Sequence, residues 1–170
     1  HDLGMALAAY PDGQEALEAD PRWADALAVR LHQMTGRAPT PEELEDAPED
    51  LRQLVLDDLL RLLHAERAEV LAETRWKDEQ SGQDLYLLED ADLRISLGQL
   101  IGRLGASHHW DVADLESEFG QVIGAHPAFT APDWGVDPLK LACLLRCADA
   151  CHIDARCAPR FLRALRRPSG

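Results

Sequence analysis

The chain of 170 residues is long enough to bury a sizeable core, and its composition, 46% hydrophobic and 28% charged, is that of a globular protein. The formal net charge of -14 at pH 7 argues against general nucleic-acid binding, which needs a basic surface for phosphate contacts. The sequence holds no apolar segment of membrane-spanning length and no signal-peptide pattern, so we expect no membrane association.

The residue types predict an all-α fold. The chain is rich in Leu, Ala, Glu and Arg, which favour helices, and only 5% of its residues are aromatic. We expect residues 1–170 to form a single helical domain. We also read it as a fragment of a longer multidomain chain, because it has no initiator methionine and stops at the sequence RRPSG.

The first part of the chain is predicted to form two helices. Residues 1–10 read as a helix that ends at the turn sequence YPDG. The next helix begins with Asp20 as N-cap and Pro21 at the first helical position, and Gly36 ends it. Its apolar face carries Trp23, Leu27 and Leu31.

A long helix is predicted to follow. Thr40, with Glu43 three residues later, has the pattern of a capping box and predicts a short helix. The longest helix is expected over residues 48–77, where leucines recur with a helical period and His64 is embedded among them.

The middle of the chain is predicted to alternate loops and helices. Residues 78–84 read as a loop, and residues 91–105 read as a helix whose end is loosened by Gly102 and Gly105. Residues 106–111, ASHHWD, are expected at a helix end or in a tight turn.

The last part of the chain is predicted to contain a short acidic helix after position 112 and two further helices. Asp137 and Pro138 open the first of the two, and residues 156–167 form the second. We expect Trp110 and Trp134 to pack in the core.

The four cysteines do not fit a disulfide framework. They are Cys143, Cys147, Cys151 and Cys157, and the first three recur every four residues on one helix. Cysteines one helical turn apart rarely reach disulfide geometry. A buried stripe is the expected arrangement, with a soft-metal or redox role as the alternative. Free thiols indicate a reducing, cytoplasmic compartment.

Six side chains are candidate metal ligands. Two are adjacent at the start, one lies inside the long helix, two are adjacent after position 107, and one lies in an apolar helix: His1, Asp2, His64, His108, His109 and Asp149. Each alone is more often an ordinary surface or core residue. Together they are the donor set of a one- or two-metal site in a helical protein, suited to Fe, Mn, Ni or Zn better than to Mg.

Two arginines lie one helical turn from these candidates. Arg67 follows His64, and Arg146 precedes Asp149. Each could hold a substrate phosphate, or could pair with a carboxylate such as Glu66 or Asp149 itself. An aspartate buried between alanines would need a cation, either Arg146 or a metal. His32 and His126 read as surface residues, and His152 could orient Asp149.

The order of these residues resembles the HD-domain superfamily of metal-dependent phosphohydrolases. The segments that carry the resemblance are HDLGM, LLHAERAEVLA, GASHHWDV and LLRCADACHID. With ADACHIDARCAPRFL, they are most similar to the HD-CE group, conflict-system-associated HD domains found next to GHKL chaperone-type ATPase modules. The resemblance implies an HD-domain-like helical bundle and the six metal ligands above, with Asp2 bridging two metals.

Two departures from the superfamily pattern limit what the resemblance implies. The first family histidine, upstream of the doublet, is absent from this sequence. The signature of the branch that degrades cyclic di-nucleotides is also absent, since Trp110 follows His109. Di-iron oxygenation, known in other branches, is the alternative chemistry for this ligand set.

The resemblance implies a metal-dependent phosphohydrolase or phosphodiesterase acting on a nucleotide or a related phosphate ester. Its candidate catalytic residues are Asp2, Arg67 and Arg146, the arginines neutralising the phosphoryl oxygens. The alternative is a non-catalytic nucleotide- or metal-sensing regulatory module coupled to an adjacent ATPase domain. A plain helical scaffold with decayed ligands is a third possibility.

Overall fold

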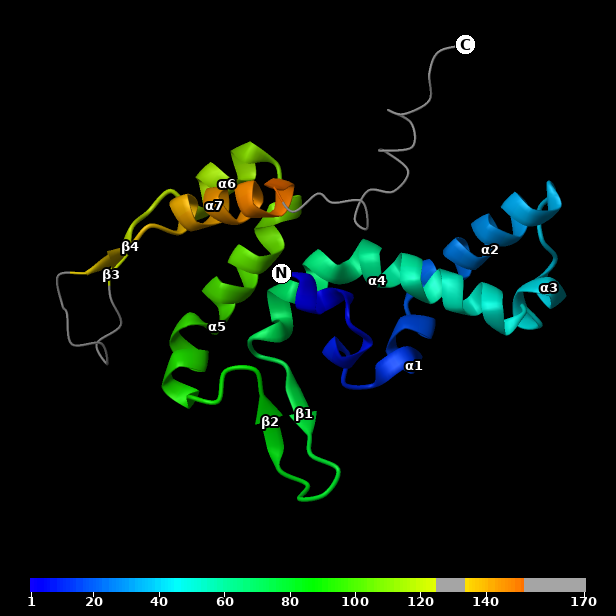
Figure 1. The fold of residues 1–170 in the computed structure, drawn as a ribbon, viewed down its shortest axis with the longest axis horizontal. Coiled ribbons are helices and arrows are strands. Elements are labelled where there is room, and N and C mark those ends of the chain that lie inside the picture. Colours follow the sequence, from blue (N-terminus) through cyan, green and yellow to red (C-terminus); the bar gives the residue numbers. More distant parts are fainter. Residues whose placement is uncertain (125–133, 152–170) are drawn as a thin grey trace, which may run out of the picture. The chain divides into compact units, whose positions relative to one another are not determined.

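The computed structural model describes residues 1–124 and 134–151, and the all-α fold expected from the sequence is confirmed (Figure 1). The described residues form seven α-helices and two small antiparallel strand pairs. The chain divides into two compact units, residues 1–106 (unit 1) and residues 107–170 (unit 2). Among the described residues, no helix combines the length and apolar character that crossing a membrane requires.

Unit 1 begins with two 3₁₀ turns rather than the expected helix over residues 1–10. They are η1 (Asp2–Met5) and η2 (Leu7–Ala9). Ala6 between them is extended, with φ -89° and ψ 135°, so the backbone cannot continue as one helix. A short helix follows, α1 (Gly13–Glu18).

The predicted caps of the next two helices are confirmed. In α2 (Pro21–Thr35) the Asp20 carboxylate accepts the backbone N–H of Arg22 at 2.8 Å, and Gly36 ends the helix with φ +74°. In α3 (Pro41–Glu45) both hydrogen bonds of the Thr40–Glu43 capping box are present.

The long helix is shorter than predicted. α4 spans Glu49–Leu71, and the residues assigned to its end instead form β1 (Arg75–Lys77), paired with β2 (Asp84–Tyr86). The Trp76 indole N–H donates to the Ala8 carbonyl at 3.0 Å, which holds the hairpin against the N-terminal turns. This contact is distant in sequence, so local helix propensity could not reveal it.

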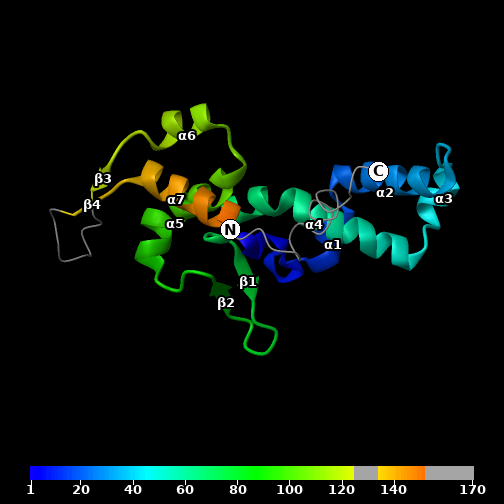
Figure 2. The same cartoon turned by 45° about the horizontal axis from the view of Figure 1, so that its top comes forward.

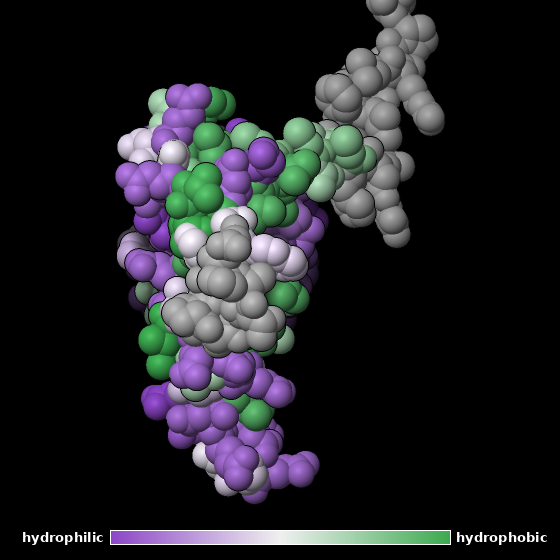
Figure 3. Space-filling view, turned by 90° about the vertical axis from the view of Figure 1, so that its left-hand side faces the viewer, coloured by the Kyte–Doolittle hydropathy of each residue, from purple (hydrophilic) through white to green (hydrophobic). Residues whose placement is uncertain are grey.

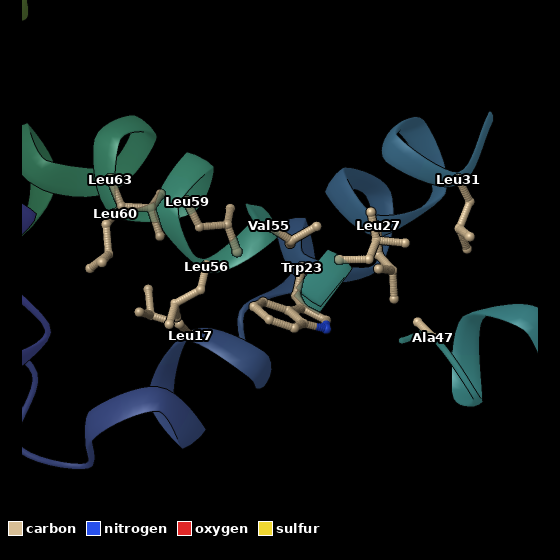
Figure 4. Packing of buried hydrophobic residues seen from close by; sticks show 11 residues of the cluster. Leu17, Trp23, Leu27, Leu31, Ala47, Val55, Leu56, Leu59, Leu60 and Leu63 are labelled. Atoms are coloured by element: carbon tan, nitrogen blue, oxygen red, sulfur yellow. The ribbon is translucent and has the colours of Figure 1, made fainter. Parts of the chain in front are cut away.

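The core of unit 1 lies where α1, α2 and α4 meet (Figure 4). Both cartoon views show α2 beside the first half of α4 (Figures 1 and 2). Leu54 and Leu62, two of the recurring leucines on which the prediction of this helix rested, are exposed. The buried side chains are Leu17, Trp23, Leu27, Leu31, Ala47, Leu51, Val55, Leu56, Leu59, Leu60 and Leu63.

Glycines let α5 (Ala91–Ala106) approach α4 closely. A Cβ on Gly102 would lie 1.8 Å from the carbonyl oxygen of Glu69, so no larger residue fits there. The prediction that Gly102 and Gly105 loosen the helix end was wrong. The helix runs through both, because the close contact with α4 compensates for their low helix propensity.

Unit 2 begins with the 3₁₀ turn η3 (Ser107–His109), as the sequence predicted, and its helices are α6 (Val112–Phe119) and α7 (Pro138–Cys151). The small pair β3 (Ile123–Gly124) and β4 (Gly135–Val136) lies between them in sequence. Both cartoon views show α6 beside α7 (Figures 1 and 2).

Local contacts in unit 2 test three predictions. The Asp137 carboxylate accepts the backbone N–H of Lys140 at 3.0 Å, which confirms the predicted cap of α7. Trp110 stacks on Phe119, with ring centroids 5.5 Å apart, whereas Trp134 is exposed, contrary to prediction. The predicted helix over 156–167 lies outside the described residues.

The prediction of a buried cysteine stripe was wrong for Cys143, Cys147 and Cys151, which are all exposed. α7 buries Pro138 and Ala142, which lie one turn apart on one face. Cys143 comes directly after Ala142, so the series of cysteines that it begins lies on a different face of the helix. Other hydrophobic residues also reach the surface, as Figure 3 shows in green. Cys157, His126 and His152 lie outside the described residues.

Candidate metal centre

The six candidate ligands divide equally between the two units. Unit 1 carries a doublet at the start of η1 and one histidine on α4: His1, Asp2 and His64. Unit 2 carries a doublet in η3 and one aspartate on α7: His108, His109 and Asp149. Each unit therefore presents a short ligand-bearing turn and a ligand-bearing helix.

His64 is buried in α4, with 7% of its surface exposed. Its Nδ1 lies 2.6 Å from the backbone carbonyl oxygen of Arg61. A carbonyl only accepts hydrogen bonds, so Nδ1 carries the proton and, in the neutral ring, the lone pair is on Nε2. This is how a protein orients a metal-binding histidine through its other ring nitrogen.

The His1–Asp2 doublet lies on η1, which packs against α4. Gly4 makes this packing possible, because a Cβ there would lie 2.2 Å from the carbonyl oxygen of His64. η1 is thereby held against the backbone of the histidine-bearing turn of α4. His1 Nε2 and Asp2 Oδ1 are 2.9 Å apart, and the Asp2 side chain is the more exposed of the two.

The second doublet lies in η3, which is closed by a hydrogen bond from the Trp110 N–H to the Ser107 carbonyl at 3.1 Å. The rings of His108 and His109 are adjacent, with centroids 4.4 Å apart and planes tilted by 56°. Ser107 is fully buried and anchors the start of the turn.

Asp149 lies on α7 and is exposed, so the premise that it is a buried carboxylate needing a cation was wrong. Burial depends on the helix face, and the alanines on either side of Asp149 are exposed as well. An exposed carboxylate stays hydrated, so its burial does not require a cation here.

The two arginines bond to backbone carbonyls. Arg67 Nε donates to the carbonyl of Ala9 at 2.7 Å, and burial lowers the pKa of its guanidinium from the usual value. Glu66 pairs with Arg22, at 2.8 Å, which does not support the alternative in which Arg67 pairs with Glu66. Arg146 donates to the carbonyls of Ser107 and Trp110, at 3.0 and 2.6 Å.

The sequence analysis missed the residues that support these ligands. Gly4, the Arg61 carbonyl and the Ala9 carbonyl position groups through contacts of the folded chain. The one available signal was the glycine two residues after the doublet, in a segment otherwise rich in helix-forming residues.

The family model for HD-CE matches residues 1–170, the whole chain. The chain belongs to the HD-CE family. No curated protein and no solved structure matches it. The resemblance found in the four HD-CE sequence segments is therefore confirmed at the level of the family.

The donor chemistry of this HD-CE chain fits a metal. Neutral imidazole and carboxylate are ligands of first-row transition metals, and the hydrogen bond of His64 leaves the lone pair of its neutral ring on Nε2. HD-CE membership and this donor set together point to a bound metal.

Proposed function

We propose that this HD-CE chain is a metal-dependent phosphohydrolase or phosphodiesterase that acts on a nucleotide or a related phosphate ester. In this proposal residues 1–170 work as one domain in the cytoplasm and hold one or two divalent metals, Fe, Mn, Ni or Zn rather than Mg. The ligands are His1, Asp2, His64, His108, His109 and Asp149.

The observation that carries the proposal is the state of His64. A buried imidazole with its Nδ1–H on a backbone carbonyl is set up to coordinate through Nε2. The packing of η1 on the same turn of α4 keeps the His1–Asp2 doublet beside it within unit 1. The family supplies the remainder of the argument, because the six ligand types follow its order.

Each group has an assigned task in this proposal. Asp2, Asp149 and the histidines would hold the one or two metals. A metal of this kind supplies an activated water for attack on phosphorus. Arg67 and Arg146 are the candidates for neutralising phosphate charge, since both are part-buried and lie one turn from a ligand.

Elemental analysis of the chain purified without chelator tests the proposal. We expect one or two equivalents of Fe, Mn, Ni or Zn, and loss of metal in His64→Ala and Asp149→Ala. His32→Ala is the matched control, because His32 is an exposed histidine on α2 that belongs to neither ligand group. Hydrolysis of bis-p-nitrophenyl phosphate is then measured in the same samples.

The outcomes separate the two functions considered. Metal content and hydrolysis that are lost together in the ligand variants support the enzyme. Metal without hydrolysis of any phosphate ester supports the regulatory module, in which the domain senses a metal or a nucleotide for an adjacent ATPase of a conflict system. No metal in the unmodified chain contradicts both metal-dependent proposals.

A further inference from the structure

We propose that Arg67 and Arg146 are positioning residues. Arg146 holds the ligand-bearing turn η3 against α7, and Arg67 holds η2, the turn that follows the ligand-bearing η1, against α4. The inference rests on the proposed function, because it treats the residues in these segments as metal ligands. It adds a role for the two arginines that does not require contact with a substrate.

In unit 1, Arg67 connects α4 to the N-terminal turns. Its Nε donates to the Ala9 carbonyl at the end of η2, and its guanidinium lies 5.1 Å from the centroid of the Tyr10 ring. A second nitrogen donates to the Thr74 hydroxyl at 3.0 Å, which fixes the orientation of the group. Arg67 is one turn from His64, so the same stretch of α4 carries a ligand and holds the segment with the His1–Asp2 doublet.

In unit 2, Arg146 does the same for the second doublet. One guanidinium nitrogen donates to two carbonyls, those of Ser107 and Trp110, which lie immediately before and after the histidines. The arginine therefore closes the turn from both ends. It is one turn from Asp149, so α7 also carries a ligand and holds the segment with the others.

Arginine suits this task because of its shape. Its planar fork presents several N–H groups in fixed directions, whereas lysine is a point charge on a flexible stem. Hydrogen bonds from a charged donor are also stronger than those between neutral groups. In a substrate-binding role alone, lysine would keep the charge that a phosphate needs. In a positioning role, lysine loses the fork and with it the geometry of the turn.

Cobalt titration of the full chain distinguishes the roles. Co²⁺ binding is followed by its visible absorption in Arg67→Lys, Arg146→Lys and the two alanine variants. We expect each variant to weaken Co²⁺ binding about 10–100-fold, the usual effect of removing a group that orients a ligand. Arg30→Lys is the matched control in unit 1, because Arg30 is a part-buried arginine on α2 whose guanidinium group donates to the Asp58 carboxylate. Lys140→Ala, with an exposed side chain, is the control for α7.

A second measurement uses the metal-free chain. Amide hydrogen exchange is expected to accelerate at Trp110 in the Arg146 variants and at Tyr10 in the Arg67 variants, since these amides close the turns that the arginines hold. Circular dichroism and the urea midpoint identify any variant that fails to fold, in which case the lysine variant is the test.

Three results are decisive. Weaker Co²⁺ binding in the lysine variants together with faster exchange at these amides supports positioning. Unchanged Co²⁺ binding in all four variants, with weakened binding of inorganic phosphate only, overturns it in favour of a substrate contact. If the unmodified chain binds no Co²⁺, the metal centre fails, and the exchange measurement alone decides whether the arginines hold the turns.

Discussion

The two units carry their candidate ligands in the same local arrangement, a short turn and a helix, but support them differently. In unit 1, His64 lies on a helix with ten buried residues, and leucines of α1, α2 and α4 form a continuous core beside it. In unit 2, the described helices bury only two residues each, Leu115 and Phe119 in α6, and Pro138 and Ala142 in α7. There Arg146 donates hydrogen bonds to the carbonyls immediately before and after the two histidines. An arginine contact is thus common to both units, and apolar packing accompanies it far more in unit 1 than in the described part of unit 2.

The largest effect is expected from the core of unit 1. Leu59→Ala removes a side chain that is 1% exposed and should lower the free energy of unfolding by about 2–5 kcal/mol. Leu62→Ala, on the same helix but 57% exposed, is the control and should change it by less than about 0.5 kcal/mol. Leu115→Ala in unit 2 should fall at the lower end of the first range, because the described helices of unit 2 bury fewer side chains than α4 does. Urea unfolding measures all three, and equal losses for Leu59→Ala and Leu62→Ala would contradict the assigned core.

A smaller effect is expected where α5 crosses α4. Gly102→Ala forces a Cβ against the Glu69 backbone and should lower the free energy of unfolding by about 1–3 kcal/mol. Gly105→Ala on the same helix meets only ordinary contact, 3.5 Å from the Ala68 Cβ, and should be neutral or slightly stabilising, because alanine favours helices. Thermal unfolding compares the two variants. Similar melting temperatures for both would show that the close crossing does not limit residue size.

Each unit has a helix capped by an aspartate, so the same substitution can be compared in both. Asp20→Ala in unit 1 and Asp137→Ala in unit 2 each remove an acceptor at the start of a helix and should cost about 0.5–2 kcal/mol. The asparagine variants keep an acceptor and serve as controls. Hydrogen exchange should localise each loss to the first turn of α2 or α7. A loss that spreads evenly through the chain would contradict the separate caps.

Asp20 also predicts a dependence on pH. Hydrogen bonds from the Arg22 side chain lower the pKa of Asp20 below its ordinary value of 3.8, against a weaker opposing effect of burial. A carboxylate whose pKa is lowered on folding stabilises the fold above its unfolded pKa and loses that contribution as pH falls through the folded pKa. The stability difference between the unmodified chain and Asp20→Asn should therefore be constant near neutral pH and shrink below about pH 4. A difference that grows on acidification would contradict this sign.

The smallest effect concerns thiol reactivity, which reports on unit 2 alone because every cysteine lies beyond residue 142. In the Cys157→Ser variant we expect Ellman's reagent to titrate three thiols in the folded chain, since Cys143, Cys147 and Cys151 are exposed. Denaturation should add none. If the thiols react only in urea, they are buried in the folded chain, as the sequence predicted.

Features that depend on neighbouring residues could be predicted from the sequence. The caps at Asp20 and Asp137, and the capping box at Thr40, join groups two or three residues apart, so their partners are visible in the sequence. The order of histidines and aspartates identified the family. The helical composition determined the fold class, because leucine and alanine favour helices wherever they pack.

Only the tertiary structure decided the rest. Arg67 hydrogen-bonds to Ala9, 58 residues away, and Trp76 hydrogen-bonds to Ala8, 68 residues away. Neither the contact of Arg67 with η2 nor that of the β1–β2 hairpin with the N-terminal turns can therefore be predicted from neighbouring residues. Asp149 and the cysteines of α7 are exposed because another face of that helix is the buried one. The periodicity of apolar residues in the sequence does not determine which face that is. The sequence alone supplied the candidate metal ligands, and their role in binding a metal stays a prediction. Packing and backbone carbonyls decided how each is held, because those contacts exist only once distant segments meet.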